Sequence, residues 1–302
     1  MRLLTLGIGI RGAKIVEMLS RKGPKVNKIP LFKPFVLLND VDALKSIALP
    51  EDRKIFILND STGAIASATN LHEISEGNLI IISFEDEFAY KTALEVVGKL
   101  KEMTEEYTVV VGIVPKIVAP NIIEIKEKIR NIRELCDVLF LFSGTFQTDE
   151  FMFKSLSLLA LAGEVDLKRR EAGEVVIDTS DIFNSLKGEG FSVIGYAERN
   201  LPFYYFGRSR SELKALRTRR MLDLLNEAMK NLSIEAEISE AKSALILFAS
   251  KAEEITMEGI FSAVSRIEKL NDNIVVRYGD CPMKTNKLHL ILLFSGIKKL
   301  IL

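Results

Sequence analysis

Short, almost fully apolar runs alternate with amphipathic stretches through the first half of the chain. Bounded apolar runs predict buried strands, and apolar positions recurring every three or four residues predict helices. Strands are expected at 2–7, 35–38, 54–58, 78–83, 107–113 and 137–142, and helices at 11–21, 85–104 and 121–135. Buried strands alternating with helices are typical of a parallel sheet covered on both faces. The pattern predicts a three-layer α/β domain of the Rossmann-like, nucleotide-binding type over 1–147.

A longer stretch at 148–170 is apolar around most of its circumference, which predicts a buried central helix. The spacing of apolar runs then changes. Strands are expected at 191–196, 243–250, 273–279 and 287–295, and helices at 181–188, 211–231 and 257–270. The last two apolar runs flank the turn sequence GDCPMKTN, which favours their pairing as a hairpin. Residues 171–302 are therefore expected to form a smaller C-terminal α/β domain with a mixed sheet.

Composition narrows the class of protein. The 302 residues, 48% of them apolar, suffice for two domains, and the balance of 41 basic against 41 acidic residues argues against a nucleic-acid-binding surface. Cys136 and Cys281 lack the spacing of a zinc site or a disulfide framework, so no metal and a reducing, cytoplasmic location are expected. The apolar runs are too short for membrane insertion. Abundant Lys, Glu and Ile without Trp indicate a thermophile.

A glycine-rich segment, Gly7-Ile8-Gly9-Ile10-Arg11-Gly12, lies between the first predicted strand and the first helix. Glycines let a backbone approach a phosphate closely, and a helix N-terminus offers free N–H groups. A tight strand-to-helix turn would need the same glycines, so both interpretations stay open. A dinucleotide-dependent enzyme is a third, although Asp40 follows later than the acid that usually binds the ribose.

Several segments, taken together and in order, resemble those of one known protein family. The glycine segment continued to Val16 is similar to the first nucleotide loop of FtsZ, and Asn39-Asp40-Val41-Asp42-Ala43-Leu44 to the Asn-Thr-Asp segment of its second strand. Further similar segments, in the family's order, are 108–116, 173–181, 190–195 and 287–297. The resemblance implies the tubulin/FtsZ fold in a divergent, archaeal-type member, with Gly7, Gly9, Gly12 and Asn39 at the nucleotide site.

The family's glycine-rich phosphate loop, Gly-Gly-Gly-Thr-Gly-Ser/Thr-Gly, has no counterpart here. Its place is taken by SFEDEFAY over 83–90, with the three acids Glu85, Asp86 and Glu87. Like charges about 4 Å apart repel by roughly 4 kcal/mol at an effective dielectric of 20, so these acids oppose a polyphosphate. Ser83 and Asp86 also have capping-box spacing, and acids complement a helix N-terminus. The segment predicts a vestigial nucleotide site blocked by acids.

Two acids follow the central helix. In the family, this loop inserts carboxylates into the nucleotide site of the next subunit, and the resemblance places Asp178 and Asp181 in that catalytic role. The family's Asn in this loop is replaced, with Val176 or Ile177 nearest its place. The alternative is that Asp178 or Asp181 caps a helix that starts near Ile182.

These observations favour an FtsZ/tubulin-like cytoskeletal or cell-division-related protein with a degenerate nucleotide site and no cofactor. It is expected to act through protein contacts, with itself or with a filament subunit, at longitudinal interfaces. The alternative is a polymer-forming GTPase that binds GTP with Mg²⁺ and hydrolyses it. Neither interpretation involves nucleic acid or insertion into a membrane.

Overall fold

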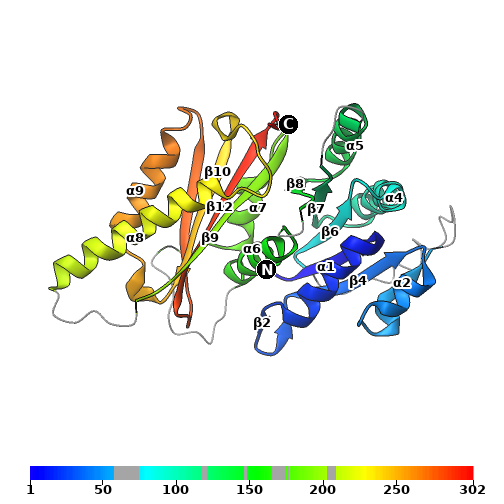
Figure 1. Cartoon of the computed structure of the whole chain (residues 1–302), viewed down its shortest axis with the longest axis horizontal. Helices are drawn as coiled ribbons and strands as arrows, with labels where there is room; N and C mark the ends of the chain where they lie inside the picture. Colours follow the sequence, from blue (N-terminus) through cyan, green and yellow to red (C-terminus); the bar gives the residue numbers. More distant parts are fainter. Residues whose placement is uncertain are drawn as a thin grey trace. The chain divides into compact units, whose positions relative to one another are not determined.

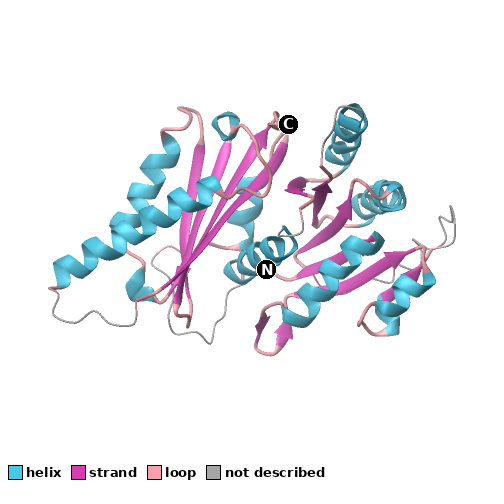
Figure 2. Ribbon diagram, in the orientation of Figure 1, coloured by secondary structure: helices cyan, strands magenta, loops and turns pink. Residues whose placement is uncertain are grey.

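The computed structural model describes residues 1–57, 75–116, 121–145, 148–164, 175, 177–202 and 209–301. Figures 1 and 2 show two compact units, Met1–Leu161 and Ala162–Ile301. The central helix predicted at 148–170 begins as expected, as α6 (Thr148–Ala162), and residues 165–170 of that prediction lie outside the described residues. The boundaries predicted at 147 and 171 stay predictions.

Among the residues that the structure describes, the first unit contains a six-stranded sheet whose strand pairs are all parallel, as the apolar runs predict. Its strands are β1 (Leu3–Ile8), β4 (Phe32–Leu38), β5 (Lys54–Phe56), β6 (Gly77–Ser83), β7 (Tyr107–Val114) and β8 (Val138–Ser143). Their spatial order is β8-β7-β6-β1-β4-β5. The strand order reverses direction between β1 and β6, so the loops that follow these two strands meet at the carboxyl edge of the sheet.

Helices cover both faces of this sheet. They are α1 (Gly9–Lys22), α2 (Val41–Ser46), α4 (Glu87–Met103) and α5 (Ile122–Leu135), with the short 3₁₀ turn η1 (Glu51–Arg53) before β5. The chain crosses the sheet in one direction from β1 to β4 and in the opposite direction from β6 to β7. Because such crossover connections are right-handed, α1 and α4 lie on opposite faces of the sheet. On α1, Ile15, Val16 and Leu19 are buried against the sheet, which gives this helix its apolar stripe.

A small hairpin that the sequence pattern did not predict lies between α1 and β4. Its strands are β2 (Lys25–Val26) and β3 (Ile29–Pro30), joined by Asn27 and Lys28, which both have positive φ. Such φ values are those of the tight turn that matches the twist of paired strands. Asn tolerates this conformation, whereas Lys adopts it rarely.

In the described part of the chain, the second unit has a mixed four-stranded sheet and three helices. Its strands are β9 (Phe191–Asn200), β10 (Ser243–Ser250), β11 (Val275–Pro282) and β12 (Lys287–Ile297). Its helices are α7 (Thr179–Leu186), α8 (Arg210–Lys230) and α9 (Met257–Glu268), with 3₁₀ turns η3 (Ile238–Glu240) and η4 (Ala252–Glu254). Helices α8 and α9 pack on one face, as Figure 1 shows, and α7 contacts β10 and β12 from the other.

The predicted hairpin between the last two strands is wrong. Strand β12 pairs antiparallel with β10 and β9, and β11 pairs in parallel with the far side of β10. The order is therefore β11-β10-β12-β9. Strand β10 is buried at every position, whereas Val275 on β11 is 55% exposed. The fully buried strand β10 thus lies in the interior of the sheet and β11 lies at its edge, in spite of the short connection between β11 and β12.

Candidate functional site

The carboxyl edge of the first sheet brings together the segments that the resemblance assigns to a nucleotide site. Gly7 on β1 lies in register with Val36 on β4 and Ile81 on β6. The glycine segment, Asn39 after β4 and the acids after β6 therefore follow three adjacent strands. Asn39 is exposed, and its neighbour Asp40 caps α2 by accepting from the backbone N–H groups of Asp42 and Ala43, at 2.9 and 3.0 Å.

Two glycines of the loop are required by packing alone. A Cβ at Gly7 would lie 2.5 Å from the carbonyl oxygen of Gly12, and a Cβ at Gly12 would lie 2.3 Å from the carbonyl oxygen of Ile81. Real Cβ atoms do not come this close to backbone atoms, which cannot rotate away. These glycines let α1 turn sharply after β1 and press against β6, whether or not a phosphate binds.

Gly9 differs, because its neighbour is an acid. Its φ is +75°, and a Cβ there would lie 2.2 Å from Oδ2 of Asp86 and 2.9 Å from Cβ of Ala89. Both neighbours belong to the segment that stands in place of the family's phosphate loop. The Asp86 carboxylate thus lies directly against the glycine loop.

The three acids predicted to block the site have different surroundings. Asp86 is half-buried, and its Oδ1 accepts from the backbone N–H of Ala89 at 3.0 Å, so Asp86 is the N-cap of α4. The capping box predicted from Ser83 is wrong, because Ser83 still belongs to β6 and the helix begins at Glu87. Glu85 is exposed. Of the three acids, Asp86 is the one that the structure places against Gly9.

Glu87 is bound to a lysine that the sequence analysis missed. Buried Lys128 on α5 contacts the Glu87 carboxylate at 2.8 Å and the Glu124 carboxylate at 2.6 Å, and donates to the carbonyl oxygen of Phe84 at 3.3 Å. The hydrogen bond from Lys128 lowers the pKa of Glu87. Burial opposes the charge on Lys128, but its bonds to Glu124 and Glu87 outweigh that effect and raise its pKa. The repulsive charge of Glu87 is therefore largely compensated within the protein.

A second group missed from sequence is Arg11, inside the glycine segment. Its guanidinium binds Oδ1 of Asp149 at the start of α6, with Nη2 at 2.8 Å and Nε at 3.3 Å. It also donates to the carbonyl oxygens of Gly144 and Thr145, at 3.0 and 3.1 Å. Arg11 thus ties the glycine loop to the loop after β8 and to α6. Its partners lie more than 130 positions away, so sequence spacing gave no signal for them.

Two contacts at this edge bear on whether a guanine nucleotide polyphosphate could bind here. The glycine that would have to let a phosphate approach is in contact with a carboxylate, and the cation of the loop is already engaged by Asp149. A phosphate beside Gly9 would have to displace Asp86, which would also remove the cap of α4.

Asp178 and Asp181, the two predicted catalytic acids, form a capping box on α7. Oδ1 of Asp178 accepts from the N–H of Asp181 at 2.7 Å, and Oδ2 of Asp181 accepts from the N–H of Asp178 at 3.4 Å. The structure thus gives both acids the capping role that was the alternative interpretation. The second oxygen of each carboxylate lies outside the capping box.

Of the two positions predicted to lie nearest the family's loop Asn, Ile177 is described, and it is apolar and buried. Ile177 is 4% exposed, and its side chain occupies the space that a Cβ on Gly279 of β11 would need. The N–H of Val175 donates to the Asp280 carboxylate at 2.8 Å, and the N–H of Asp280 donates back to the carbonyl oxygen of Val175 at 3.0 Å. Val176 lies outside the described residues. This loop is therefore anchored to the edge strand of the second unit.

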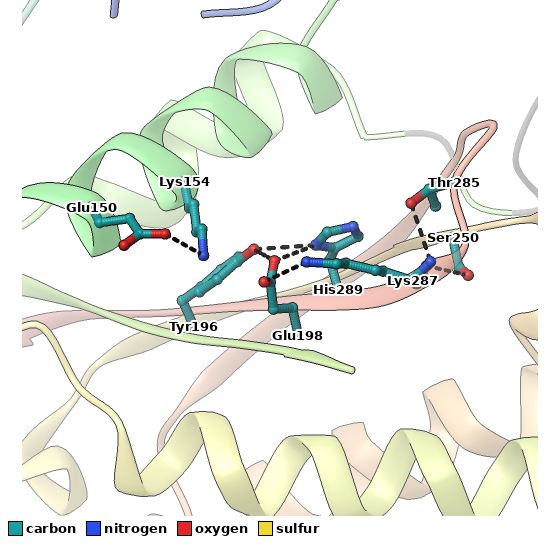
Figure 3. Close-up of polar contacts among 8 residues, drawn as sticks. All are labelled: Glu150, Lys154, Tyr196, Glu198, Ser250, Thr285, Lys287 and His289. Atoms are coloured by element: carbon teal, nitrogen blue, oxygen red, sulfur yellow. Dashed lines mark hydrogen bonds and ion pairs between the residues drawn. The ribbon is translucent and has the colours of Figure 1, made fainter. Parts of the chain in front are cut away.

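A polar cluster on β9 and β12 was also missed. Figure 3 shows the side chains of Tyr196, Lys287 and His289 converging on the carboxylate of Glu198. The Tyr196 hydroxyl and Lys287 Nζ both donate to Glu198 at 2.7 Å, and Nδ1 of His289 lies 3.1 Å from the Tyr196 hydroxyl. Cross-strand pairing of Glu198 with His289 creates the cluster. Because the Glu198 carboxylate accepts hydrogen bonds from Tyr196 and Lys287, we interpret the cluster as a structural one. The Glu150–Lys154 pair in the same picture lies on α6 of the first unit.

The described residues contain no group of three or more His, Cys, Asp or Glu side chains that could hold a metal ion. Within the same part of the chain, every helix is too short or too polar to cross a membrane.

The two cysteines are expected to differ in reactivity. Burial raises the pKa of Cys136 to about 12, whereas Cys281 on β11 is half-buried. The thiolate is the reacting form, so Cys136 is protected at pH 8. We expect iodoacetamide to alkylate Cys281 of the folded protein and to leave Cys136 intact, as read by peptide mass spectrometry. Both should react in guanidinium chloride, and equal labelling of the folded protein would contradict the burial of Cys136.

Comparison with known proteins identifies the family. A family profile described as "Tubulin-like CetZ, C-terminal domain" matches residues 143–301, more than half of the chain. The tubulin-like protein CetZ4 of Haloferax volcanii is 25% identical, over 98% of this chain and 88% of its own length.

Two solved structures from the same organism share the fold. The GDP-bound monomer of CetZ1 has a TM-score of 0.82 at 20% identity, covering 100% of this chain and 96% of that one. The GTPγS-bound protofilament of CetZ2 has a TM-score of 0.78 at 16% identity, covering 100% and 95%. At these identities the likeness establishes the fold, which is the tubulin-like fold predicted from sequence. The chain belongs to the tubulin-like CetZ family, within the tubulin/FtsZ superfamily.

Proposed function

We propose that this CetZ-family protein is a cytoskeletal protein that works through protein contacts and has a nucleotide site closed by its own side chains. The observation that carries the proposal is the Asp86 carboxylate against Gly9, where a phosphate would have to approach. The Arg11 contacts with Asp149, Gly144 and Thr145 support it, because they join the loop, the end of β8 and α6 without a ligand.

The partner is proposed to be a second copy or another filament subunit, met at a longitudinal interface. Three exposed apolar side chains support a protein contact at the carboxyl edge of the first sheet. Ile10, Val41 and Ile123 are 45%, 45% and 78% exposed, each in the first turn of a helix that begins at this edge. Related CetZ2 was solved as a protofilament, which is consistent with contacts between subunits. We place the protein in the cytoplasm, in cytoskeletal organisation or cell division.

The second candidate is a GTP-binding, GTP-hydrolysing polymer subunit. It is favoured by the bound GDP of CetZ1 and the bound GTPγS of CetZ2. In that case Asp86 would have to leave Gly9 when nucleotide enters, and Asp178 and Asp181 would act on the nucleotide of an adjacent subunit.

Sedimentation of the full chain separates the two candidates. We expect the same sedimented fraction with GTP and Mg²⁺, with GDP, and without nucleotide. We expect Ile123→Asp to lower that fraction and Ile301→Asp, a matched change at a side chain 52% exposed on the second unit, to leave it unchanged. Assembly that requires GTP and releases phosphate would support the second candidate and contradict the first.

A further inference from the structure

A basic surface projects from the first unit at the hairpin β2–β3. Lys22, Lys25 and Lys28 are exposed, and in the part of the chain that the structure describes none of them forms an ion pair or a side-chain hydrogen bond. Residues 21–33 contain no acidic residue. The turn even holds Lys28 in the left-handed region, at a φ of 68° that lysine adopts rarely. We call residues 22–30 the basic hairpin.

An acidic surface lies at the end of α4 and before β7. Glu102, Glu105 and Glu106 are exposed and have no ion pair among the described residues. The neighbouring lysine, Lys101, is already 3.8 Å from Asp137. We call residues 102–106 the acidic segment.

Each surface carries one large exposed apolar side chain among its charges. Ile29 is 46% exposed on the basic hairpin, and Met103 is 49% exposed on the acidic segment. An apolar side chain with a border of charges is typical of a protein contact surface. The two surfaces therefore carry equal numbers of charges of opposite sign, and each has one exposed apolar side chain.

The basic hairpin and the acidic segment lie too far apart in the fold to contact each other within one molecule. Both lie at the amino edge of the first sheet, because one precedes β4 and the other precedes β7. The basic hairpin follows α1 and the acidic segment follows α4, and these helices cover opposite faces of the sheet. Each surface is thus presented away from the other and away from the glycine loop, which lies at the carboxyl edge.

We propose that the basic hairpin of one copy docks on the acidic segment of a second copy, side by side. Such a contact is heterologous, so it leaves one basic and one acidic surface free at the two ends and can be repeated. A lipid or nucleic-acid partner would use the basic hairpin alone and give no role to the acidic segment. This contact is separate from the longitudinal one and does not depend on whether the glycine loop binds nucleotide.

Charge reversal tests this contact in the full chain. The basic-reversed variant is K25E/K28E and the acid-reversed variant is E105K/E106K. Sedimentation velocity in about 0.1 M salt, where the Debye length is about 10 Å, should show self-association of the wild type. We expect each variant to weaken self-association by about tenfold or more.

Restoration of matching charges is the decisive outcome. A chain that carries both reversals should associate as the wild type does, and a mixture of the two single variants should form mixed oligomers. The control K14E/K126E changes the net charge equally at exposed lysines outside the basic hairpin, and it should associate normally. Equal weakening in that control would show a net-charge effect and overturn the proposal.

Three further outcomes would also overturn it. The first is a wild type that stays monomeric at all salt concentrations. The second is self-association that the acid-reversed variant retains. The third is binding of the wild type to anionic vesicles or RNA, lost in the basic-reversed variant and unchanged in the acid-reversed one. None of these depends on GTP binding, so this proposal and the closed nucleotide site can fail separately.

Discussion

Gly12→Ala is expected to destabilise the first unit by about 3 kcal/mol. The added methyl group would lie 2.3 Å from the carbonyl oxygen of Ile81 and 3.2 Å from its carbonyl carbon, and both are backbone atoms of β6. Helix α1 would have to move off the sheet, which loosens the burial of Ile15 and Leu19. Urea denaturation followed by circular dichroism measures the change in the free energy of unfolding.

The same substitution at Gly98 is the matched control. Gly98 lies inside α4, and a Cβ built there meets no atom within 4 Å. Ala is the better helix former, so Gly98→Ala should be neutral or stabilise by up to about 1 kcal/mol. A small effect of Gly12→Ala, similar to that of Gly98→Ala, would contradict the packing role of the glycine loop. The loop would then need another reason for its glycines, such as a bound phosphate.

Glu254→Ala is expected to destabilise the second unit by about 3 kcal/mol, because it removes a buried carboxylate that binds two half-buried arginine side chains. The Glu254 side chain is 3% exposed and binds Nε of Arg217 at 3.1 Å and Nη1 of Arg220 at 2.5 Å. These bonds join η4 to α8. Thermal unfolding monitored by circular dichroism would register the loss as a lower Tm.

The neighbouring residue provides the control for that change. Glu253 is exposed on the same 3₁₀ turn, and its replacement by Ala should change the free energy of unfolding by less than about 0.5 kcal/mol. A similar loss in both variants would point to the turn itself and not to the buried ion pair. A negligible loss in Glu254→Ala would contradict the burial of the carboxylate.

The fold was predictable where burial leaves a strong pattern. Strands β1, β6, β7 and β8 of the parallel sheet are mostly apolar and are buried at all or all but one of their positions, so their number and type followed from the sequence. The pairing of β11 was not predictable in the same way, because an apolar run such as that of β12 suits a neighbour on either side. The short connection between β11 and β12 favoured a hairpin of these two strands. In the structure, the fully buried β10 lies between them.

The candidate site was predictable to the level of segments but not of contacts. The order of the family-like segments located the glycine loop and the acids after β6, and capping-box spacing then predicted Ser83 as the cap with Asp86 as its partner. In the structure, helix α4 begins at Glu87, so Asp86 is its N-cap. The bonds of Arg11 with Asp149 and of Lys128 with Glu87 join residues far apart in the chain, and no periodicity encodes them.

The role of the acids also changed with the structure. From sequence, three neighbouring negative charges repel a polyphosphate. In the structure, Lys128 compensates Glu87, Glu85 is exposed, and Asp86 is the acid that lies against Gly9. Occupied space and a helix cap, more than charge alone, now support the closed site.

Titration of the purified wild-type protein with GTP and Mg²⁺ in a calorimeter tests this most directly. With Asp86 held against Gly9, we predict no saturable heat beyond that of dilution. A stoichiometric isotherm with micromolar affinity would contradict it, because the triphosphate would then have found room where the Asp86 carboxylate lies.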